Sequence, residues 1–357
     1  MKINNFSAGP SKIPQTVIDQ LSKDIIGYKD FGYSVLELSH RSQEFDEILQ
    51  DTKKNLVNIL NIPKNFDIIF LQGGATFQNT FIAANKPSLF DNIIFLLTGT
   101  WGTKTYDDFQ KYSGKKISKI SLSDQKLEDL VEEVNLHKSE YLYLASNETI
   151  EGIQIKNFNY FNKKLIIDMS SDICSYKFDW DNISFIYAGA QKNLGIPGVT
   201  ICILENNFIE ENNLTSYLNA KNHINKDSAF NTPPTFSIYV MLNILNWINV
   251  NGGIEKIEEN NILKANKIYR LIDENLEKLI PLAPKDLRSI SNIVFDFKDK
   301  NKTEQFLKQS SENGFLGLNG HRSIGGVRIS NYNSISQEMV SNLLKFIQKF
   351  LSSYWVY

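Results

Sequence analysis

Short apolar runs alternate with mixed polar and apolar segments along the first two thirds of the chain. Each run is rich in isoleucine, leucine, phenylalanine or tyrosine, as buried strands are. The runs occupy residues 67–71, 92–97, 141–145, 164–168, 183–188 and 199–204. The segments between them are long enough to hold helices, so the pattern predicts an α/β domain with a mainly parallel sheet.

Two helical segments stand out in this pattern. After Gly73-Gly74 the sequence has good helix formers up to a stop at Lys86-Pro87, which predicts a crossover helix. The longest helical pattern covers about residues 254–280 and follows a break at Asn251-Gly252-Gly253. We interpret this long helix as the connection into a second domain.

The last hundred residues predict a smaller α/β unit with a mixed sheet. Its expected elements are strands at 291–297 and 327–330, a helix near 303–313 and an amphipathic terminal helix. We therefore divide the chain into a large domain, residues 16–253, and a small C-terminal domain, residues 254–357, with residues 1–15 packing near the small domain.

Composition excludes several classes of protein. The chain is 42% hydrophobic and 22% charged, with a net charge of −2, which is ordinary for a globular protein and gives no basic surface for nucleic acid. No run approaches the ~20 apolar residues that span a bilayer, and we expect a cytoplasmic protein with no membrane partner. The two cysteines and four histidines show no metal-ligand spacing, so we assign no metal site.

Lys192 is the most unusual charge, because it lies in a small-residue turn between the apolar runs 183–188 and 199–204. Ligands of open α/β sheets bind where strands deliver such loops. A lysine desolvated there can lose its proton and form a Schiff base with an aldehyde. The alternative is an ordinary solvated loop lysine, which describes most lysines.

Other residues at strand ends would complete a site for a phosphorylated aromatic aldehyde. Asp168 could pair with a protonated ring nitrogen, and Trp101 could lie over a flat ring. Thr149 could bind a phenolic oxygen, and Gln191 could reach phosphate. Each of them also has a structural explanation, as a helix cap, a core aromatic or a turn residue.

A phosphate cradle is predicted at Gly73-Gly74-Ala75-Thr76, where a strand leads into a helix. Backbone amides at a helix N-terminus bind phosphate, although the same sequence also suits a tight turn. The chain has neither a dinucleotide-binding nor a Walker-type glycine motif, which disfavours a nucleotide.

Two His-Arg pairs and a further arginine supply candidate anion-binding groups. They are His40-Arg41, His321-Arg322 and Arg328. Arginine binds carboxylate and phosphate bidentately, so a substrate with two anionic ends would suit this set. The alternative is arginines at the surface, paired with nearby acids.

Several motifs taken in chain order closely resemble those of the phosphoserine aminotransferases, pyridoxal-phosphate enzymes of fold type I. The motifs are NFSAGPSKIP, ELSHRS, LQGGAT, TWG, SNETIEGI, IIDMSSD, YAGAQKN, FNTPPTF and GHRSIGGVR. The resemblance runs from about residue 5 to the C-terminus and implies a large domain with a seven-stranded, mainly parallel sheet and a smaller C-terminal domain.

The resemblance also implies a role for each candidate residue. Lys192 would bind the cofactor aldehyde and then act as the proton carrier, while Asp168, Trp101 and Thr149 would contact the cofactor ring. The phosphate would be bound by a set of residues that includes a neighbouring subunit's Asn231 and Thr232: Ala75, Thr76, Gln191, Asn231 and Thr232. A homodimer with shared active sites is therefore implied.

For the substrates, the resemblance assigns Arg41 to glutamate, Arg328 to the substrate α-carboxylate, and His40, His321 and Arg322 to the distal phosphate or carboxylate. Thr76 replaces an arginine of some family members, which implies altered substrate contacts without loss of activity. The expected reaction is amino transfer between L-glutamate and 3-phosphohydroxypyruvate, with side activity on the four-carbon phosphorylated keto acid of pyridoxine synthesis.

Two other functions are less consistent with the sequence. A desulfurase of the same fold needs a mobile reactive cysteine, and neither Cys174 nor Cys202 suits that role. A non-catalytic protein that kept the fold would be expected to lack the lysine, the aspartate or the arginines, all of which are present.

Overall fold

A seven-stranded sheet forms the centre of the larger part of the molecule. The computed structural model describes residues 3–122, 126–211 and 213–353. The strand order is β2-β10-β9-β8-β5-β3-β4, and β10 alone runs antiparallel to its neighbours in this sheet. The strands are β2 Phe66–Leu71, β3 Ile93–Leu97, β4 Ser118–Ser121, β5 Tyr141–Ala145, β8 Lys164–Asp168, β9 Ile183–Gly189 and β10 Thr200–Glu205. The predicted α/β class with a mainly parallel sheet is confirmed.

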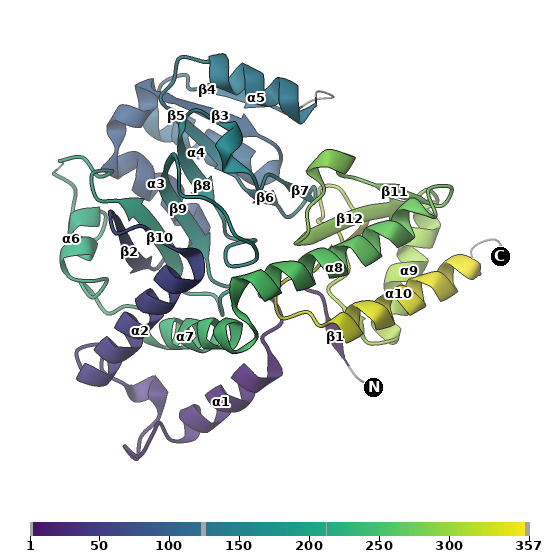
Figure 1. Ribbon diagram of the computed structural model, residues 1–357, viewed down its shortest axis with the longest axis horizontal. Coiled ribbons are helices and arrows are strands. Elements are labelled where there is room, and N and C mark those ends of the chain that lie inside the picture. Colours follow the sequence, from purple (N-terminus) through teal and green to yellow (C-terminus); the bar gives the residue numbers. More distant parts are fainter. Residues whose placement is uncertain (1–2, 123–125, 212, 354–357) are drawn as a thin grey trace.

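Helices cover both faces of this sheet (Figure 1). Successive strand residues point to opposite faces, so Ile94 and Leu96 enter one core while Phe95 and Leu97 enter the other. The second of these cores includes α3 Gly74–Asn85, α4 Thr100–Ser113 and α6 Ala220–Asn225. The first includes α1 Gln15–Ile26, α2 Gln43–Leu60, α5 Leu127–Leu136 and α7 Thr235–Val250. Because both faces of the sheet are buried, the sequences of the strands are continuous apolar runs.

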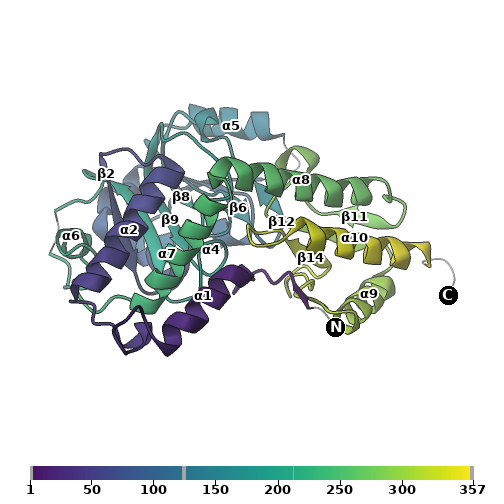
Figure 2. The same ribbon diagram turned by 60° about the horizontal axis from the view of Figure 1, so that its bottom comes forward.

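A separate hydrophobic core belongs to the C-terminal region. Its elements are α8 Gly253–Asp273, β11 Leu279–Pro281, β12 Asn292–Phe297, α9 Lys300–Glu312, β13 Phe315–Leu316, β14 Val327–Ser330 and α10 Gln337–Ser352. Strands β11, β12 and β14 form a sheet that is antiparallel throughout, which corrects the mixed sheet predicted for this region, and β1 (Asn4–Asn5) pairs in parallel with β13. The N-terminal segment therefore lies against this region, as Figure 2 shows. The domain limits at residues 15, 253 and 254 stay a prediction.

Short elements complete the chain. A hairpin of β6 (Asn147–Glu148) and β7 (Ile153–Gln154) follows β5 directly. Single 3-10 turns lie at Val35–Glu37, Pro87–Asp91, Phe158–Tyr160 and Lys285–Leu287.

The structure corrects three local predictions. The helix predicted for 254–280 ends at Asp273, and a strand begins at Leu279; Leu276, counted in the helical pattern, is 47% exposed. Strand β4 was missed, because its sequence SKIS offers one apolar residue, Ile120. The helix expected near 303–313 starts earlier, since Asp299 caps it by accepting a hydrogen bond from the Asn301 amide.

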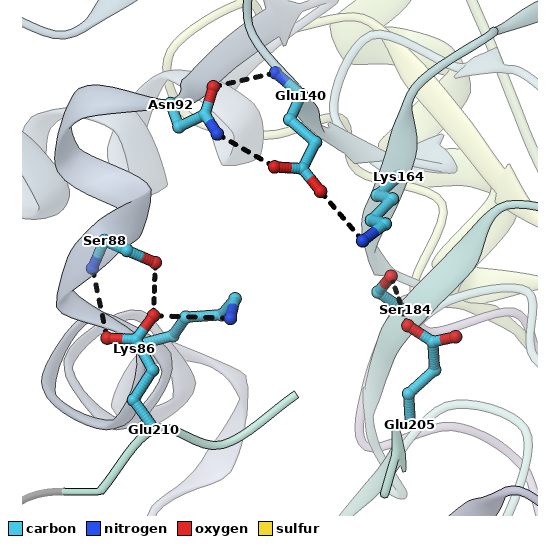
Figure 3. A network of polar contacts seen from close by, with 8 residues as sticks. All are labelled: Lys86, Ser88, Asn92, Glu140, Lys164, Ser184, Glu205 and Glu210. Atoms are coloured by element: carbon cyan, nitrogen blue, oxygen red, sulfur yellow. Dashed lines mark hydrogen bonds and ion pairs between the residues drawn. The ribbon is translucent and has the colours of Figure 1, made fainter. Parts of the chain in front are cut away.

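Charged side chains at the amino ends of the strands pair with one another (Figure 3). Lys164, the first residue of β8, lies 2.8 Å from a carboxylate oxygen of Glu140. Glu140 also accepts a hydrogen bond from Asn92 Nδ2 at 3.0 Å. Nearby, Ser184 donates to Glu205 at 2.7 Å. This end of the sheet therefore holds its polar groups in mutual contacts.

Candidate active site

A cavity of about 350 Å³ lies at the opposite, carboxyl ends of the strands. Parallel strands bring the residues that follow them to one edge of the sheet, which is where such folds bind ligands. The lining residues are Ala8, Gly9, Gly74, Ala75, Thr76, Trp101, Asn147, Thr149, Asp168, Ser170, Ser171, Gln191, Lys192, His321 and Arg328. An adjacent pocket of about 300 Å³ shares Ala75, Thr76, Trp101 and Asp168 with it. The structure thus gathers nine of the residues predicted from the sequence: Ala75, Thr76, Trp101, Thr149, Asp168, Gln191, Lys192, His321 and Arg328.

Lys192 lies in the turn after β9, as the sequence predicted. Its backbone is held on both sides by Ser11, whose amide donates to the Gln191 carbonyl at 3.0 Å and whose hydroxyl donates to the Lys192 carbonyl. Its Nζ lies 5.7 Å from the centre of the Trp101 ring. Within the described residues no hydrogen bond or ion pair engages this nitrogen. The interpretation as a solvated loop lysine is wrong.

Burial lowers the pKa of the Lys192 amine, and the positive charge of Arg328 adds to the effect. The negative charges of Asp168 and Glu148 oppose it. A lysine with a lowered pKa has a larger share of the free amine near neutral pH, which is the form that attacks an aldehyde and accepts a proton.

Asp168 is the last residue of β8 and points toward the same cavity. Its Oδ1 accepts a hydrogen bond from the Ser170 amide at 2.8 Å. Burial raises the pKa of this carboxyl, although Ser170, Lys192 and Tyr187 favour its charged form. A cationic nitrogen placed against Asp168 would remove the cost of that burial.

Trp101 and Thr149 are joined across the cavity wall. Trp101 lies in the first turn of α4, and its Nε1 donates to Thr149 Oγ1 at 2.9 Å. Arg328 Nη1 donates to the Thr149 carbonyl at 3.2 Å. The Arg328 Nε is buried without a hydrogen-bond partner in the described part of the chain. A carboxylate bound at Arg328 would satisfy this nitrogen.

The first turn of α3 forms the predicted anion cradle. Gly73 precedes the helix with a φ of 97°, and a Cβ there would come within 2.7 Å of Phe77 Cβ, so glycine is required. The first amides of a helix have no partner within the helix, and those of Ala75 and Thr76 lie at the cavity. These amides are suited to a phosphate.

Five predicted residues do not line the cavity: His40, Arg41, Asn231, Thr232 and Arg322. Arg41, Thr232 and Arg322 are exposed. The Asn231 amide lies 3.4 Å from Gln72 Oε1, at the protein surface. His321 does reach the cavity, and its Nδ1 lies 2.7 Å from Ser323 Oγ.

Sequence reasoning missed some residues at the site. Ala8 and Gly9 line the cavity and belong to the quoted motif NFSAGPSKIP, but no role had been given to them. Glu148 was also missed, although an acid in a strand-like run next to Thr149 is a signal for a buried charge. Cys174 and Cys202 are both fully buried, and burial raises the pKa of each thiol, so neither suits the role of a mobile reactive cysteine.

The residues present fit pyridoxal phosphate. The cavity offers an amine with a lowered pKa for the aldehyde, a carboxyl for the ring nitrogen, an indole for the ring and helix amides for the phosphate. The unpartnered Arg328 Nε adds a place for a substrate carboxylate.

Comparison with known proteins agrees with this fit. Residues 3–343 match the family model of the class V aminotransferases. The phosphoserine aminotransferase of Bacillus subtilis is 38% identical, with 98% of each chain covered. A solved phosphoserine aminotransferase from Bacillus circulans subsp. alkalophilus superposes with a TM-score of 0.92 at 34% identity, covering 99% of each chain. The pyridoxal-phosphate-bound enzyme of Trichomonas vaginalis gives 0.88 at 29% identity, covering 97% of this chain and 100% of its own.

The fold and the family model define a pyridoxal-phosphate-dependent aminotransferase of class V. Within that class, the chain belongs to the phosphoserine aminotransferase family. The family implies pyridoxal-phosphate-dependent transamination in serine biosynthesis. Among the described residues, no helix combines the length and the apolar character needed to cross a membrane.

Proposed function

We propose that the enzyme transfers the amino group of L-glutamate to 3-phosphohydroxypyruvate, giving 2-oxoglutarate and O-phospho-L-serine. The observation that supports this best is the position of Arg328, with a buried and unpartnered Nε, in the same cavity as Lys192 and Asp168. Amino donor and acceptor both carry an α-carboxylate, so one arginine serves both halves of the reaction.

The cofactor would be held by groups at the ends of five strands: β2, β3, β6, β8 and β9. Asp168 would bind the ring nitrogen, Trp101 would lie on the ring, and Thr149 would contact the ring oxygen. When bound, pyridoxal phosphate supplies an aldehyde that reacts with amines and a ring that withdraws electrons from the substrate α-carbon. Its phosphate would be bound by Ala75, Thr76 and Gln191 of one chain and by Asn231 and Thr232 of a second chain.

Lys192 would act as the general base and general acid of the reaction. Its lowered pKa gives a free amine that takes the proton from the substrate α-carbon and later returns it, first as a base and then as an acid. Asp168 keeps its charge beside the protonated ring nitrogen, and this pairing offsets the burial that raises its pKa in the free protein. Hydrogen bonds from Ser11 to the carbonyls of Gln191 and Lys192 fix the backbone from which this side chain extends.

The distal anionic group of each substrate would be bound by the His-Arg pairs. His321 lies at the cavity, while His40, Arg41 and Arg322 lie outside it. We propose a homodimer in which a second chain brings such residues, together with Asn231 and Thr232, to each site. Lys192→Ala and Asn231→Ala test this arrangement, because co-expression of the two defective chains should recover activity if sites are shared and should not if each chain is self-sufficient.

A second keto acid fits the same proposal. 3-Hydroxy-2-oxo-4-phosphooxybutanoate, used in pyridoxine biosynthesis, differs from 3-phosphohydroxypyruvate by one hydroxyl-bearing carbon. A difference of this size in a pocket changes binding by only about 1–3 kcal/mol, so we expect a lower but measurable activity. We place the enzyme in the cytoplasm, where both pathways would draw on it.

Turnover with L-glutamate and each of the two keto acids tests the substrate assignment. We expect phosphoserine formation with 3-phosphohydroxypyruvate to be the faster reaction. Binding of pyridoxal phosphate without turnover of either keto acid would overturn the assignment.

A further inference from the structure

We propose that Glu148 is a positioning residue, which sets the pose of Trp101 and Thr149 against the cofactor by holding the amino end of α4. The inference deepens the proposed function and rests on its assignment of Trp101 and Thr149 to the cofactor. Glu148 does not itself line the cavity; it acts through the two residues that do.

The Glu148 side chain is fully buried and both its oxygens point at the start of α4. Oε2 accepts a hydrogen bond from the Trp101 amide at 2.9 Å, and Oε1 accepts one from the Gly102 amide at 2.8 Å. A Cβ at Gly102 would lie 3.2 Å from Oε1, so glycine gives this oxygen its close approach. The carboxyl therefore fixes the backbone that carries the Trp101 indole.

A second hydrogen bond fixes the indole ring of Trp101. Its Nε1 donates to the hydroxyl of Thr149, the residue that follows Glu148 in the chain. Glu148 and Thr149, which are adjacent in one hairpin, thus accept hydrogen bonds from the backbone amide and the ring nitrogen of Trp101. Two anchors of this kind fix the tilt of the ring as well as its place, which a cap on the backbone alone would not do.

Glu151 offers a matched comparison at the same helix end. Its Oε1 accepts from the Thr100 amide at 3.0 Å and from the Thr100 hydroxyl at 2.5 Å. It therefore supports α4 one residue before Trp101 and has no bond to Trp101 or Gly102. Both glutamates stabilise the helix end, and Glu148 alone is linked to the residues of the cavity.

The charge of Glu148 also acts on the site. Burial raises the pKa of its carboxyl to about 8, with Glu151 and Asp168 adding to the effect and the two amide donors opposing it. Above that pKa, its negative charge in turn raises the pKa of the Lys192 amine and of the Tyr143 hydroxyl. Removing that charge should lower the pKa of Lys192.

The test compares Glu148→Gln and Glu148→Asp with the control Glu151→Gln. Three quantities are measured: the dissociation constant of pyridoxal phosphate from the apoprotein, the visible circular dichroism of the bound cofactor, and the pH at which its absorbance changes. For Glu148→Gln we expect about tenfold weaker cofactor binding, reduced dichroism and a spectral change shifted to lower pH. Glu148→Asp keeps the charge but is one methylene short, so it should reduce the dichroism with little shift in pH. Glu151→Gln should match the wild type in all three.

Two outcomes would overturn the inference. One is an equal effect of Glu148→Gln and Glu151→Gln, which would mean that Glu148 only stabilises the helix. The other is wild-type dichroism in Glu148→Asp, which decides the matter even if Glu148→Gln does not fold. Trp101→Phe and Thr149→Val show whether the positioning role alone is wrong or the proposed function as well. If these two variants also leave the visible circular dichroism of the cofactor unchanged, the assignment of the site itself is wrong.

Discussion

Strand β8 begins with a lysine and ends with an aspartate. The pKa values of the charged groups at its two ends are shifted for different reasons. At the amino end, Lys164 and Glu140 lie 2.8 Å apart; the hydrogen bond between them lowers the pKa of Glu140 and raises that of Lys164 (Figure 3). At the carboxyl end, burial outweighs the partners of Asp168 and Lys192, raising the pKa of the acid and lowering that of the amine.

The comparison indicates which end of the sheet can gain free energy by binding a ligand. Charges at the amino end are already satisfied by neighbours and by solvent, so a ligand would gain little there. At the carboxyl end, buried groups such as Arg328 Nε have no partner in the described residues, and a ligand that supplies one gains free energy on binding.

The largest effect is expected from Lys192→Ala. Lys192 is the only lysine among the described residues that line this cavity, and with the loss of its amine we expect kcat to fall by at least about a thousandfold. The rate of 2-oxoglutarate release from glutamate measures this. Lys164→Ala removes a lysine from the other end of the sheet and should leave the rate unchanged; a comparable loss there would contradict the assignment.

Arg328→Leu should come next. We expect the KM for glutamate to rise about a hundredfold, because a charge-assisted contact to the α-carboxylate is lost. Arg288→Leu is the control, since Arg288 already binds Asp273 through two hydrogen bonds of 2.7 and 2.8 Å. An unchanged KM in Arg328→Leu, measured at steady state, would remove Arg328 from substrate binding.

The pH dependence of stability should have opposite signs at the two ends. Burial raises the pKa of Asp172, close to the site, to about 6, so the native state holds its proton more tightly than the unfolded chain. Its contribution is present below about pH 4 and is lost as the pH rises through 6, a change of about 2–3 kcal/mol. Glu140 has a lowered pKa, so its contribution is present above pH 4 to 5 and is lost as the pH falls.

Urea unfolding of Asp172→Asn and Glu140→Gln between pH 4 and 7 checks these signs. The wild-type minus Asp172→Asn difference in the free energy of unfolding should fall from pH 4 to 6. The difference for Glu140→Gln should instead rise over the lower part of that range, by less than about 1 kcal/mol because the pair is half exposed. If the two differences in the free energy of unfolding changed with pH in the same direction, the predicted opposite signs would be contradicted.

The smallest effect is expected from Lys164→Ala on stability. The Lys164–Glu140 pair is about half exposed, and such pairs contribute about 0.2–1 kcal/mol. Thermal unfolding of Lys164→Ala, with Lys164→Arg as the charge-preserving control, measures this. A loss of several kcal/mol would show that the amino end carries more of the stability than its geometry indicates.

Much of the fold could be predicted from the sequence because strands buried on both faces leave continuous apolar runs. The run at 141–145 matches β5 residue for residue, and the glycines before 75 mark the start of α3. Strand β4 could not be found this way, since its sheet contacts come from backbone pairing with β3 and its side chains are mostly exposed. The end of α8 was missed because Leu276 continues the helical spacing beyond the point where the chain turns.

The site could be predicted residue by residue only where a motif supplied the role. Lys192 and Asp168 follow strands, so their approach to one edge of the sheet is a consequence of topology. Glu148 could not be assigned, because its role depends on contacts with Trp101 and Gly102, which lie 47 and 46 residues earlier in the chain. Those contacts are set by the packing of α4 beside the β6–β7 hairpin, which no local pattern reports.

The most direct test of the central claim is a single turnover carried out in two steps with the enzyme loaded with pyridoxal phosphate. L-glutamate alone should release one 2-oxoglutarate per site. After glutamate is removed, 3-phosphohydroxypyruvate should be converted to one O-phospho-L-serine per site, with neither step occurring in Lys192→Ala. Release of 2-oxoglutarate without subsequent formation of phosphoserine, or no release at all from a loaded site, would contradict the account.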